Sequence, residues 1–388
     1  MKSKLSERVQ KLPPSKFAEI RRLVMGCTDV IRLELGEPDF ATPKHVKEAA
    51  IQAINEDFTH YTPTEGLLEL REAVARKLKR ENGIEADPET EILITDGGFG
   101  AVFAAVQSLV NPGDEVLVPD PAWPRYFQNV LLAGGVPKRI FLEEKDGFVL
   151  DVDEVKKHVT KKTKLVVLNT PNNPTGAVVS KNVLEEIGDL AVEHDLILLL
   201  DEVYERIVYE PKHFSLATHS DIKDRIITVF SLSKTYAMTG WRIGYAVSNE
   251  NVIKAMGKVS TYANACRNSV AQKAAIAALD GPQECVENMV KEYRRRRDLM
   301  IDRLKEMESF SVTKPTGAFY VYPRILLDVE SPDFVKQLLE KAKVSVMPGT
   351  TFSVKGEKYL RFSYANSMEK ISEAMDRVQG LVSQLMKA

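Results

Sequence analysis

The stretch SLSKTYAMTGWRIGY, residues 231–245, places two serines, a lysine and an arginine around a Gly-Trp pair. The residues directly before it, IITVF (226–230), form an apolar run typical of a buried strand. Ser231, Ser233 and Lys234 are therefore predicted to lie on the turn after the C-terminal end of that strand. In open α/β sheets, ligands bind at this end of the strands. Taken alone, the stretch is equally compatible with a polar loop whose lysine forms a salt bridge.

Four other apolar runs are followed by polar or glycine-rich motifs in the same way. Continuous Val, Ile and Leu runs that alternate with helical patterns are typical of a parallel sheet buried on both faces. The chain is therefore predicted to have an α/β fold in which five motifs meet at one edge of the sheet. The four further units are EILI (91–94) before TDGGFG, EVLVP (115–119) before DPAWPRY, KLVVLN (164–169) before TPNNPTG, and LILLL (196–200) before DEVYE.

Helical patterns flank this region on both sides. The N-terminal segment has apolar residues at helical spacing before Pro13-Pro14 and is predicted to form a short helix or arm. Residues 43–57 and 65–81 are predicted to be amphipathic helices. A long charged helix is predicted over 286–307, and its run Arg294 to Arg297 is interpreted as a solvated helix face.

The length of 388 residues favours two subdomains. Gly281-Pro282 marks a candidate boundary, and after about residue 285 the pattern loosens to short strands and helices, as in a smaller α+β unit. The predicted division is 1–44 as an N-terminal arm and part of the small domain, 45–285 as the large ligand-binding domain, and 286–388 as the C-terminal small domain.

The composition narrows the class of protein. Hydrophobic residues make up 44% and charged residues 28%, an ordinary globular balance, and the formal net charge of -2 does not indicate binding to nucleic acid or an anionic membrane. No stretch resembles a membrane span or an export signal, so a soluble cytoplasmic protein is expected. The cysteines form no CxxC pair, so neither a disulfide framework nor a metal site is expected. They are Cys27, Cys266 and Cys285.

Two of the motifs offer groups that suit a phosphate. Gly97-Gly98-Phe99 opens a predicted helix, where small residues let backbone N–H groups and the helix N-terminus meet an anion. Ser231, Ser233 and Arg242 add two hydroxyls and a guanidinium, which suit a phosphate dianion. By itself, a Gly-Gly pair before a helix is also explained by a tight turn.

A second set of side chains suits a flat, protonated ring. Asp201 follows five apolar residues, and a desolvated carboxylate is costly unless it meets a cation such as a ring nitrogen. Trp123 offers a flat face, although core filling is the commoner role of a single tryptophan. Asn173 and Tyr204 offer an amide and a phenol to a ring oxygen, and Lys234 offers an amine that forms a Schiff base once deprotonated. Phosphate, pyridinium, phenolic oxygen and aldehyde are the groups of pyridoxal 5′-phosphate (PLP).

With these motifs the chain resembles the class I/II aminotransferases, PLP-dependent enzymes of fold type I that include aspartate and aromatic aminotransferases. The resemblance spans nearly the whole chain in the family's order. It implies a large domain with a mostly parallel seven-stranded sheet between helices, and a smaller α+β domain. The matching segments are LGEPDF (35–40), YTPTEGLLELREAV (61–74), TDGGFGA (95–101), PAWPRY (121–126), NTPNNPTG (169–176), DEVYE (201–205), SLSKTYAMTGWRIGY (231–245), PTGAFYVYP (315–323) and YLRFSYA (359–365).

The resemblance implies a role at the cofactor for each matched residue. Lys234 is expected to hold PLP as a Schiff base and to move a proton between the substrate α-carbon and the cofactor. Asp201 is expected to pair with the pyridinium nitrogen, and Trp123 to stack on the ring. Asn173 and Tyr204 are expected to hydrogen-bond the phenolic oxygen. The expected phosphate ligands are Gly97, Gly98, Phe99, Ser231, Ser233 and Arg242.

The resemblance also implies substrate contacts and a partner subunit. Arg361 is expected to clamp the substrate α-carboxylate with a bidentate fork. Asn173, Trp123 and the backbone of Gly36 are expected to help bind the substrate. Tyr61 is expected to reach the phosphate in the neighbouring subunit, which implies a homodimer.

One residue departs from the pattern of the family, and two others leave the choice of substrate open. Phe99 stands where many relatives carry a hydroxyl or a lysine side chain, so phosphate binding is expected to depend more on Arg242 and the serines. Arg125 and Arg267 are candidates for binding a second substrate carboxylate. A surface or dimer-interface ion pair is the alternative for each.

The implied reaction is a ping-pong transamination between an L-amino acid and a 2-oxo acid, with aspartate and 2-oxoglutarate as the first expectation. Aromatic amino acids or alanine remain open, as do the reactions of C–S β-lyases and 1-aminocyclopropane-1-carboxylate synthases, which share the motifs. A PLP-dependent transcription regulator is a hypothesis of another class. It needs an added helix-turn-helix domain, and the segment before LGEPDF (35–40) is expected to be too short for one.

Overall fold

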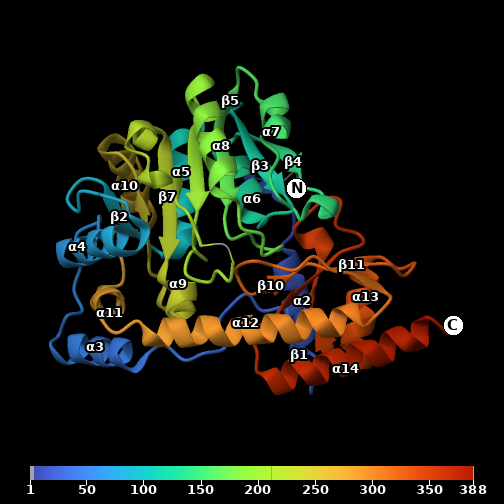
Figure 1. The fold of residues 1–388 in the computed structure, drawn as a ribbon. Coiled ribbons are helices and arrows are strands. Elements are labelled where there is room, and N and C mark those ends of the chain that lie inside the picture. The colour runs from blue at the N-terminus through green and yellow to red at the C-terminus, as the bar shows by residue number, and fades with distance from the viewer. Residues whose placement is uncertain (1–3, 211, 388) are drawn as a thin grey trace.

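A seven-stranded sheet lies at the centre of the computed structural model, which describes residues 4–210 and 212–387 (Figure 1). Residues 1–3 and 388, at the ends of the predicted N-terminal and C-terminal segments, and residue 211 lie outside the described part. The strand order is β2-β8-β7-β6-β5-β3-β4, and β8 alone runs in the direction opposite to the other strands. The strands are β2 (Ile92–Thr95), β3 (Glu115–Asp120), β4 (Val136–Phe141), β5 (Thr163–Asn169), β6 (Ile197–Asp201), β7 (Ile226–Ser231) and β8 (Gly244–Val247).

All five strands predicted from the sequence are present in this sheet as β2, β3, β5, β6 and β7. Their continuous apolar runs are explained by burial on both faces, because β3 and β7 are buried at every residue. β4 and β8 complete the sheet. The carboxyl ends of the parallel strands therefore meet along one edge, which brings the motifs that follow them together.

Helices cover both faces of the sheet. Successive side chains of a strand point to opposite faces, so they pack into different apolar cores. On one face Leu93, Val167 and Ala246 pack with α5, α6 and α10. On the other face Val166 packs with α7 and α8, and Ile94 packs with α3, α4 and α11. These helices are α3 (Lys44–Asn55), α4 (Leu68–Lys77), α5 (Gly97–Leu109), α6 (Arg125–Ala133), α7 (Val152–His158), α8 (Lys181–Glu193), α10 (Glu250–Asn264) and α11 (Ser269–Asp280).

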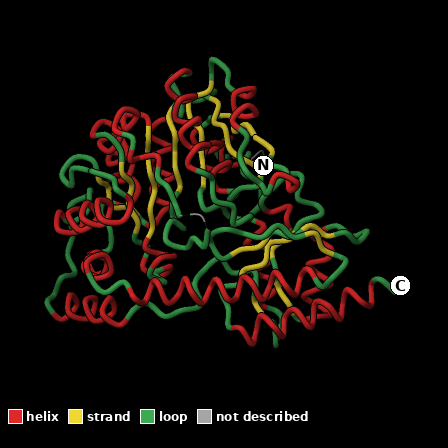
Figure 2. Tube along the Cα trace, in the orientation of Figure 1, coloured by secondary structure: helices red, strands yellow, loops and turns green. Residues whose placement is uncertain are grey.

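A second apolar core combines the N-terminal segment with the C-terminal part of the chain. The long helix α12 (Glu284–Lys305) leads from the large sheet into this region, and Figure 2 shows a smaller group of short strands beside it. β1 (Ile31–Arg32) pairs in parallel with β12 (Val344–Ser345), which joins the two ends of the chain. The other elements are α1 (Glu7–Gln10), α2 (Lys16–Met25), β9 (Phe310–Ser311), β10 (Tyr320–Val321), β11 (Arg324–Ile325), α13 (Ser331–Gln337), β13 (Met347–Pro348), β14 (Leu360–Ser363) and α14 (Met368–Leu385).

Short helical turns complete the described structure. The division into domains at residues 44 and 285 stays a prediction, and the second proposed boundary falls near the start of α12. Among the described residues, no helix is long and apolar enough to cross a membrane. The turns are η1 (Leu78–Asn82), η2 (Glu144–Asp146), η3 (Leu216–Thr218), η4 (Ser220–Arg225), η5 (Thr239–Trp241), η6 (Leu338–Ala342), η7 (Gly349–Thr351) and the one-turn helix α9 (Leu232–Thr235).

The arginine run on α12 differs from the sequence prediction of a solvated face. Arg296 and Arg297 are buried, although Arg294 is exposed. Arg296 pairs with Asp39 at 2.7 Å and its guanidinium also lies over an aromatic ring. The helix lies between two parts of the chain, so consecutive arginines face different neighbours and only part of the run meets solvent.

Candidate active site

A cavity of about 500 Å³ lies at the carboxyl ends of the central strands. It gathers motifs that are far apart in the sequence, because β5, β6 and β7 end side by side there. Every predicted site residue lines it except Gly97 and Tyr61. The lining residues are Phe17, Gly36, Gly98, Phe99, Trp123, Arg125, Tyr126, Asn169, Asn173, Asp201, Val203, Tyr204, Ser231, Ser233, Lys234, Thr239, Arg242, Tyr320 and Arg361.

Lys234 lies on α9, the single turn that follows β7. The Ser231 side chain caps this turn by accepting a hydrogen bond of 3.2 Å from the backbone N–H of Ser233. Nζ of Lys234 donates to the backbone carbonyl of Gly36 at 2.5 Å. Burial lowers the pKa of the Lys234 amine to about 8, and the charges of Arg361 and Arg242 act in the same direction. A neutral amine, able to act as a nucleophile or base, is therefore accessible near neutral pH.

Asp201 ends β6 and is only 3% exposed. Burial raises the pKa of its carboxyl to about 6, although hydrogen bonds from the Tyr126 hydroxyl and the Val203 N–H oppose the shift. These bonds measure 2.6 Å and 3.2 Å. Among the described residues no cation forms an ion pair with Asp201, so this buried carboxylate at the cavity wall suits a positively charged ligand atom.

One end of the cavity is built around the start of α5. Gly97 has a left-handed φ of 68°, and a Cβ there would lie 2.5 Å from Nη2 of Arg242. Arg242 donates to the carbonyls of Asp96 at 3.0 Å and Thr239 at 2.8 Å. Its Nη1 lies 3.5 Å from the Ser233 hydroxyl. A guanidinium, a hydroxyl and the N-terminus of a helix thus meet in one place, which suits an anion such as phosphate.

Arg361 lies on β14 and is 1% exposed. Its Nη1 donates to Oδ1 of Asn173 at 3.0 Å and its Nη2 to the carbonyl of Glu34 at 2.6 Å. Nε is buried without a hydrogen-bond partner, and no carboxylate pairs with this guanidinium in the described part of the chain. The plane lies over the Tyr320 ring at 4.4 Å. A buried, oriented and unpaired guanidinium suits a ligand carboxylate.

The aromatic groups close the remaining walls of the cavity. The hydroxyls of Tyr204 and Tyr320 lie 2.9 Å apart. Trp123 stands edge to face against Tyr126 and Phe99, with ring centroids 5.5 Å and 5.8 Å away. The ring of Phe99 therefore occupies the cavity wall directly, in addition to any contact that its backbone makes.

The two candidate arginines have different surroundings. The Arg125 guanidinium lies over the rings of Phe99 and Trp123 at 4.7 Å and 5.5 Å, and within the described chain it has no acidic partner. Arg267 does not line the cavity, is 2% exposed and pairs with Asp96. Arg267 therefore forms an ion pair, but inside the protein and not at the surface that the alternative interpretation gave it.

Two predicted site residues lie outside the cavity lining. Gly97 lies behind Arg242, where a side chain would collide with the guanidinium. Tyr61 is 91% exposed and does not reach the cavity of its own chain. Its proposed contact across a dimer interface is untested by a single chain.

Six lining residues received no role from the sequence: Phe17, Tyr126, Asn169, Val203, Thr239 and Tyr320. Tyr126 and Tyr320 occur in matched segments, PAWPRY and PTGAFYVYP, so position within a motif was an available signal. Phe17 comes from α2, in a segment without any motif, and Val203 lies between two residues with assigned roles. In the described residues, no three His, Cys, Asp or Glu side chains form a group that could hold a metal ion.

Comparison with known proteins identifies the class of enzyme that this fold and cavity define. Residues 28–378 match the family described as aminotransferase class I and II. The chain belongs to this family and is an aminotransferase. The predictions of its family and fold type are therefore confirmed.

Individual relatives are similar over nearly their whole length. An aspartate aminotransferase of Pyrococcus abyssi is 46% identical over 379 residues, covering 97% of each chain. An aromatic-amino-acid aminotransferase of Thermococcus litoralis is 44% identical over 384 residues, covering 98% of each. A solved structure of the Thermus thermophilus aspartate aminotransferase with maleate superposes with a TM-score of 0.92 at 41% identity, covering 98% of this chain and 100% of the other.

Proposed function

We propose that this aminotransferase binds PLP in the cavity and transfers the amino group of aspartate to 2-oxoglutarate. The observation that carries the cofactor assignment is that the buried, unpaired carboxylate of Asp201 lines the same cavity as Lys234, an amine whose pKa is lowered by burial. Asp201 suits the pyridinium nitrogen, and Arg242, Ser233 and the start of α5 suit the phosphate. Asn173 and Tyr204 are the proposed partners of the phenolic oxygen.

When bound, PLP supplies an electron sink for the charge left on the substrate α-carbon after its proton leaves. Lys234 is the proposed point of covalent attachment and the base that removes and returns that proton at its Nζ. Because burial lowers the pKa of this amine to about 8, a substantial fraction is neutral near pH 7 to 8. Arg361 is proposed to orient the substrate by its α-carboxylate, with Nε as the free donor.

The surroundings of Arg125 favour the assignment of a dicarboxylic substrate. It lines the cavity beside Phe99 and has no acidic partner among the described residues, so its charge is available to a second carboxylate. The aspartate aminotransferases among the relatives support the same choice. A second candidate is an aromatic substrate, because the rings of Phe17, Phe99 and Trp123 line the same space and one close relative is an aromatic-amino-acid aminotransferase.

We further propose a cytoplasmic homodimer in which Tyr61 contributes to the active site of the partner. Tyr61 supports this proposal because it is almost fully exposed on the single chain although it lies in a matched segment. Analytical ultracentrifugation tests the assembly. If the dimer exists, Tyr61→Phe should weaken retention of PLP without changing the sedimentation coefficient.

Visible absorption of the purified protein with added PLP tests the proposed function. Titration with one L-amino acid at a time should convert the band of the lysine-bound cofactor into that of pyridoxamine phosphate, most readily with aspartate or glutamate. Conversion only by aromatic amino acids would favour the second candidate. Release of pyruvate and ammonia would instead indicate a lyase, and absence of any cofactor band would refute the assignment of the site.

A further inference from the structure

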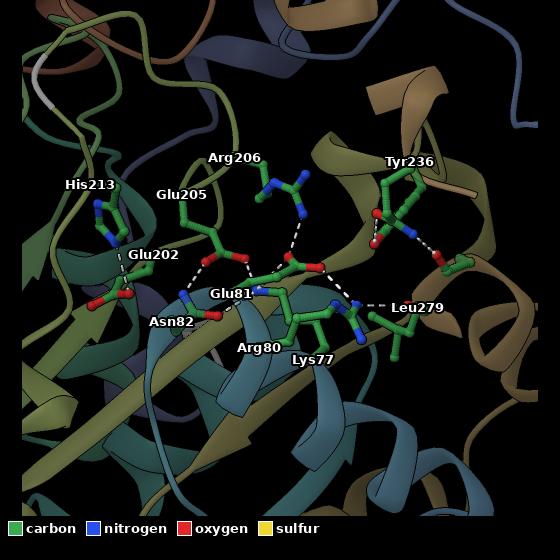
Figure 3. Close-up of polar contacts among 12 residues, drawn as sticks. Lys77, Arg80, Glu81, Asn82, Glu202, Glu205, Arg206, His213, Tyr236 and Leu279 are labelled. Atoms are coloured by element: carbon green, nitrogen blue, oxygen red, sulfur yellow. Dashed lines mark hydrogen bonds and ion pairs between the residues drawn. The ribbon is translucent and has the colours of Figure 1, made fainter. Parts of the chain in front are cut away.

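The segment DEVYER, residues 201–206, alternates between two environments. Asp201 and Tyr204 line the cavity, and each is followed directly by a glutamate that does not. Glu202 is fully buried, and the Glu205 side chain is only 7% exposed. Figure 3 shows Glu205 among the contacts of Lys77, Glu81 and Asn82, and Glu202 beside them in contact with His213. We call this group the buried charge network: Lys77, Glu81, Asn82, Glu202, Glu205, Arg206, His213 and Ser215.

Glu205 is contacted by side chains of helix α4 and of the turn η1, which extends that helix. Its carboxylate accepts hydrogen bonds from Nζ of Lys77 and from Nδ2 of Asn82. The Lys77 side chain is 2% exposed, so this is a pair between two buried charges. Burial opposes ionisation of Glu205, but the charge of Lys77 and the hydrogen bonds outweigh it and lower the pKa of the carboxyl. Lys77 also donates to Oδ1 of Asn82 at 2.8 Å, which completes a triangle of contacts.

Glu202 is held from the other side, by the loop before η3. Its carboxylate accepts a hydrogen bond of 2.8 Å from the Ser215 hydroxyl and lies 2.9 Å from Nε2 of His213. The backbone N–H of Glu202 donates to the carbonyl of Val229 at 2.9 Å, in the strand that ends before Lys234. Glu202 is therefore tied to β7, the strand that precedes the turn of Lys234, and to a loop on the far side of the segment.

The charges of the network balance when His213 is protonated. Glu81, Glu202 and Glu205 are its carboxylates. Its cations are the buried Lys77 and the partly exposed Arg206, which pairs with Glu81. Burial opposes protonation of His213, but the charge of Glu202 and the contact with it raise the pKa of the imidazole. Arg80 adds a further cation at the exposed rim, where it contacts Glu81.

Stability alone does not explain such a network. The cost of desolvating two charges is about as large as their attraction, so a buried ion pair adds little over a well-packed apolar pair. What charges do add is a defined position, because only one arrangement satisfies all the hydrogen bonds. The position defined here is that of residues 202 and 205, and hence of the neighbouring Asp201 and Tyr204.

We propose that Lys77, Glu202, Glu205 and His213 are positioning residues that hold Asp201 and Tyr204 in register with Lys234. This inference rests on the proposed function, in which Asp201 and Tyr204 meet the pyridinium nitrogen and the phenolic oxygen. The network reaches neither the cofactor nor the substrate. The network contacts residues 202 and 205 on the side of the segment that faces away from the cavity. It thereby fixes the positions of Asp201 and Tyr204, which face the cavity.

The test is a double variant of the holoenzyme, Lys77→Met with Glu205→Gln, which removes both charges of one pair. A single change would leave an uncompensated buried charge and unfold the protein for a trivial reason. The control is Lys138→Met with Glu115→Gln, which removes a more exposed ion pair, 3.3 Å long, at the end of β3 that lies away from the cavity. Wild-type enzyme that shows no cofactor band would refute the proposed function, and the positioning role would then fall with it.

Three readouts separate positioning from mere stabilisation. In the double variant, kcat should fall about 10-fold while KM changes little, because Arg361 is untouched. The pH midpoint of the cofactor's visible band should rise, because the Tyr204 hydroxyl no longer favours the deprotonated form. The unfolding temperature should stay close to that of the control variant.

An unchanged midpoint and an unchanged kcat in a folded double variant would overturn the proposal. If that double variant does not fold, His213→Gln with Glu202→Gln is measured with the same readouts, because it removes both charges of the second pair and leaves residue 202 an oxygen that can accept the hydrogen bond from Ser215. This second double variant should show a smaller rise of the midpoint and a smaller loss of kcat. Wild-type values in it would then refute the positioning role.

Discussion

The hydroxyl of Tyr126 donates a hydrogen bond of 2.6 Å to Oδ2 of Asp201, across the two sequence motifs PAWPRY and DEVYE. Both residues are buried, Tyr126 at the start of α6 and Asp201 at the end of β6. Burial raises the pKa of Asp201 to about 6, and the Tyr126 hydroxyl is the strongest influence in the opposite direction. Tyr126 therefore helps to keep Asp201 ionised, which is the form that suits a pyridinium nitrogen.

Tyr126→Phe should weaken PLP binding about 10-fold, because the lost donor bonds an ionised group. The pH dependence of this loss follows from the ionisation of Asp201. Without the hydroxyl its pKa rises above about 6, so the ionised form is lost as pH falls through a higher value. Equilibrium dialysis of PLP should show the largest loss near pH 6 and the smallest near pH 9. Tyr209→Phe is the control, since the Tyr209 hydroxyl donates to the Ala318 carbonyl outside the cavity. Equal losses at both pH values would contradict the link to Asp201.

Lys234→Ala should abolish turnover, with kcat reduced about 10³-fold or more, because both the point of attachment and the proposed base are removed. Added amino acid should remain bound to PLP on the enzyme, visible in the absorption spectrum. Normal turnover would disprove the role of Lys234.

Attachment of PLP to the apoprotein should depend on pH through Lys234. The amine attacks only when neutral, and its pKa of about 8 lies well below the usual value of a lysine. The attachment rate measured by stopped-flow absorption should rise with pH and level off above about 8. An attachment rate that still rises steeply at pH 10 would show that the pKa of Lys234 is not lowered in this way.

Arg361→Lys should raise KM about 10-fold for every substrate, because an ammonium lacks the fork that meets a carboxylate and the plane that packs on Tyr320. Steady-state kinetics with aspartate, alanine and phenylalanine measure this. A loss confined to aspartate would mean that Arg361 contacts the side chain of the substrate instead.

Arg125→Gln should lower kcat/KM for aspartate and glutamate by about 10-fold and leave alanine almost unchanged. The reason is that only dicarboxylic substrates bring a second charge to this guanidinium, which no acidic group of the described chain neutralises. Activity with phenylalanine should hold or rise, since the ring of Phe99 stays in place. A uniform loss over all substrates would instead indicate that Arg125 supports the cavity wall.

Much of the site was predictable because its residues sit at fixed places in local patterns. An apolar run such as LILLL must be buried, so Asp201 after it had to be a buried carboxylate at a strand end. The same argument placed Ser231 and Lys234 after β7. What such patterns lack is any information on which distant group lies opposite. Arg267 pairs with Asp96, 171 positions away, and no spacing in the sequence indicates it.

The sequence by itself determined the central sheet, the edge at which its motifs meet and the residues that are proposed to bind PLP. These follow from periodicity and from motif spacing, which act within a few residues. Only the tertiary structure decided that Arg296 is buried, that Arg125 has no acidic partner among the described residues, and that Glu202 and Glu205 lie outside the cavity lining. The physical reason is that the energy of a charge depends on burial and on its partners. Those partners come from segments brought together only when the chain has folded.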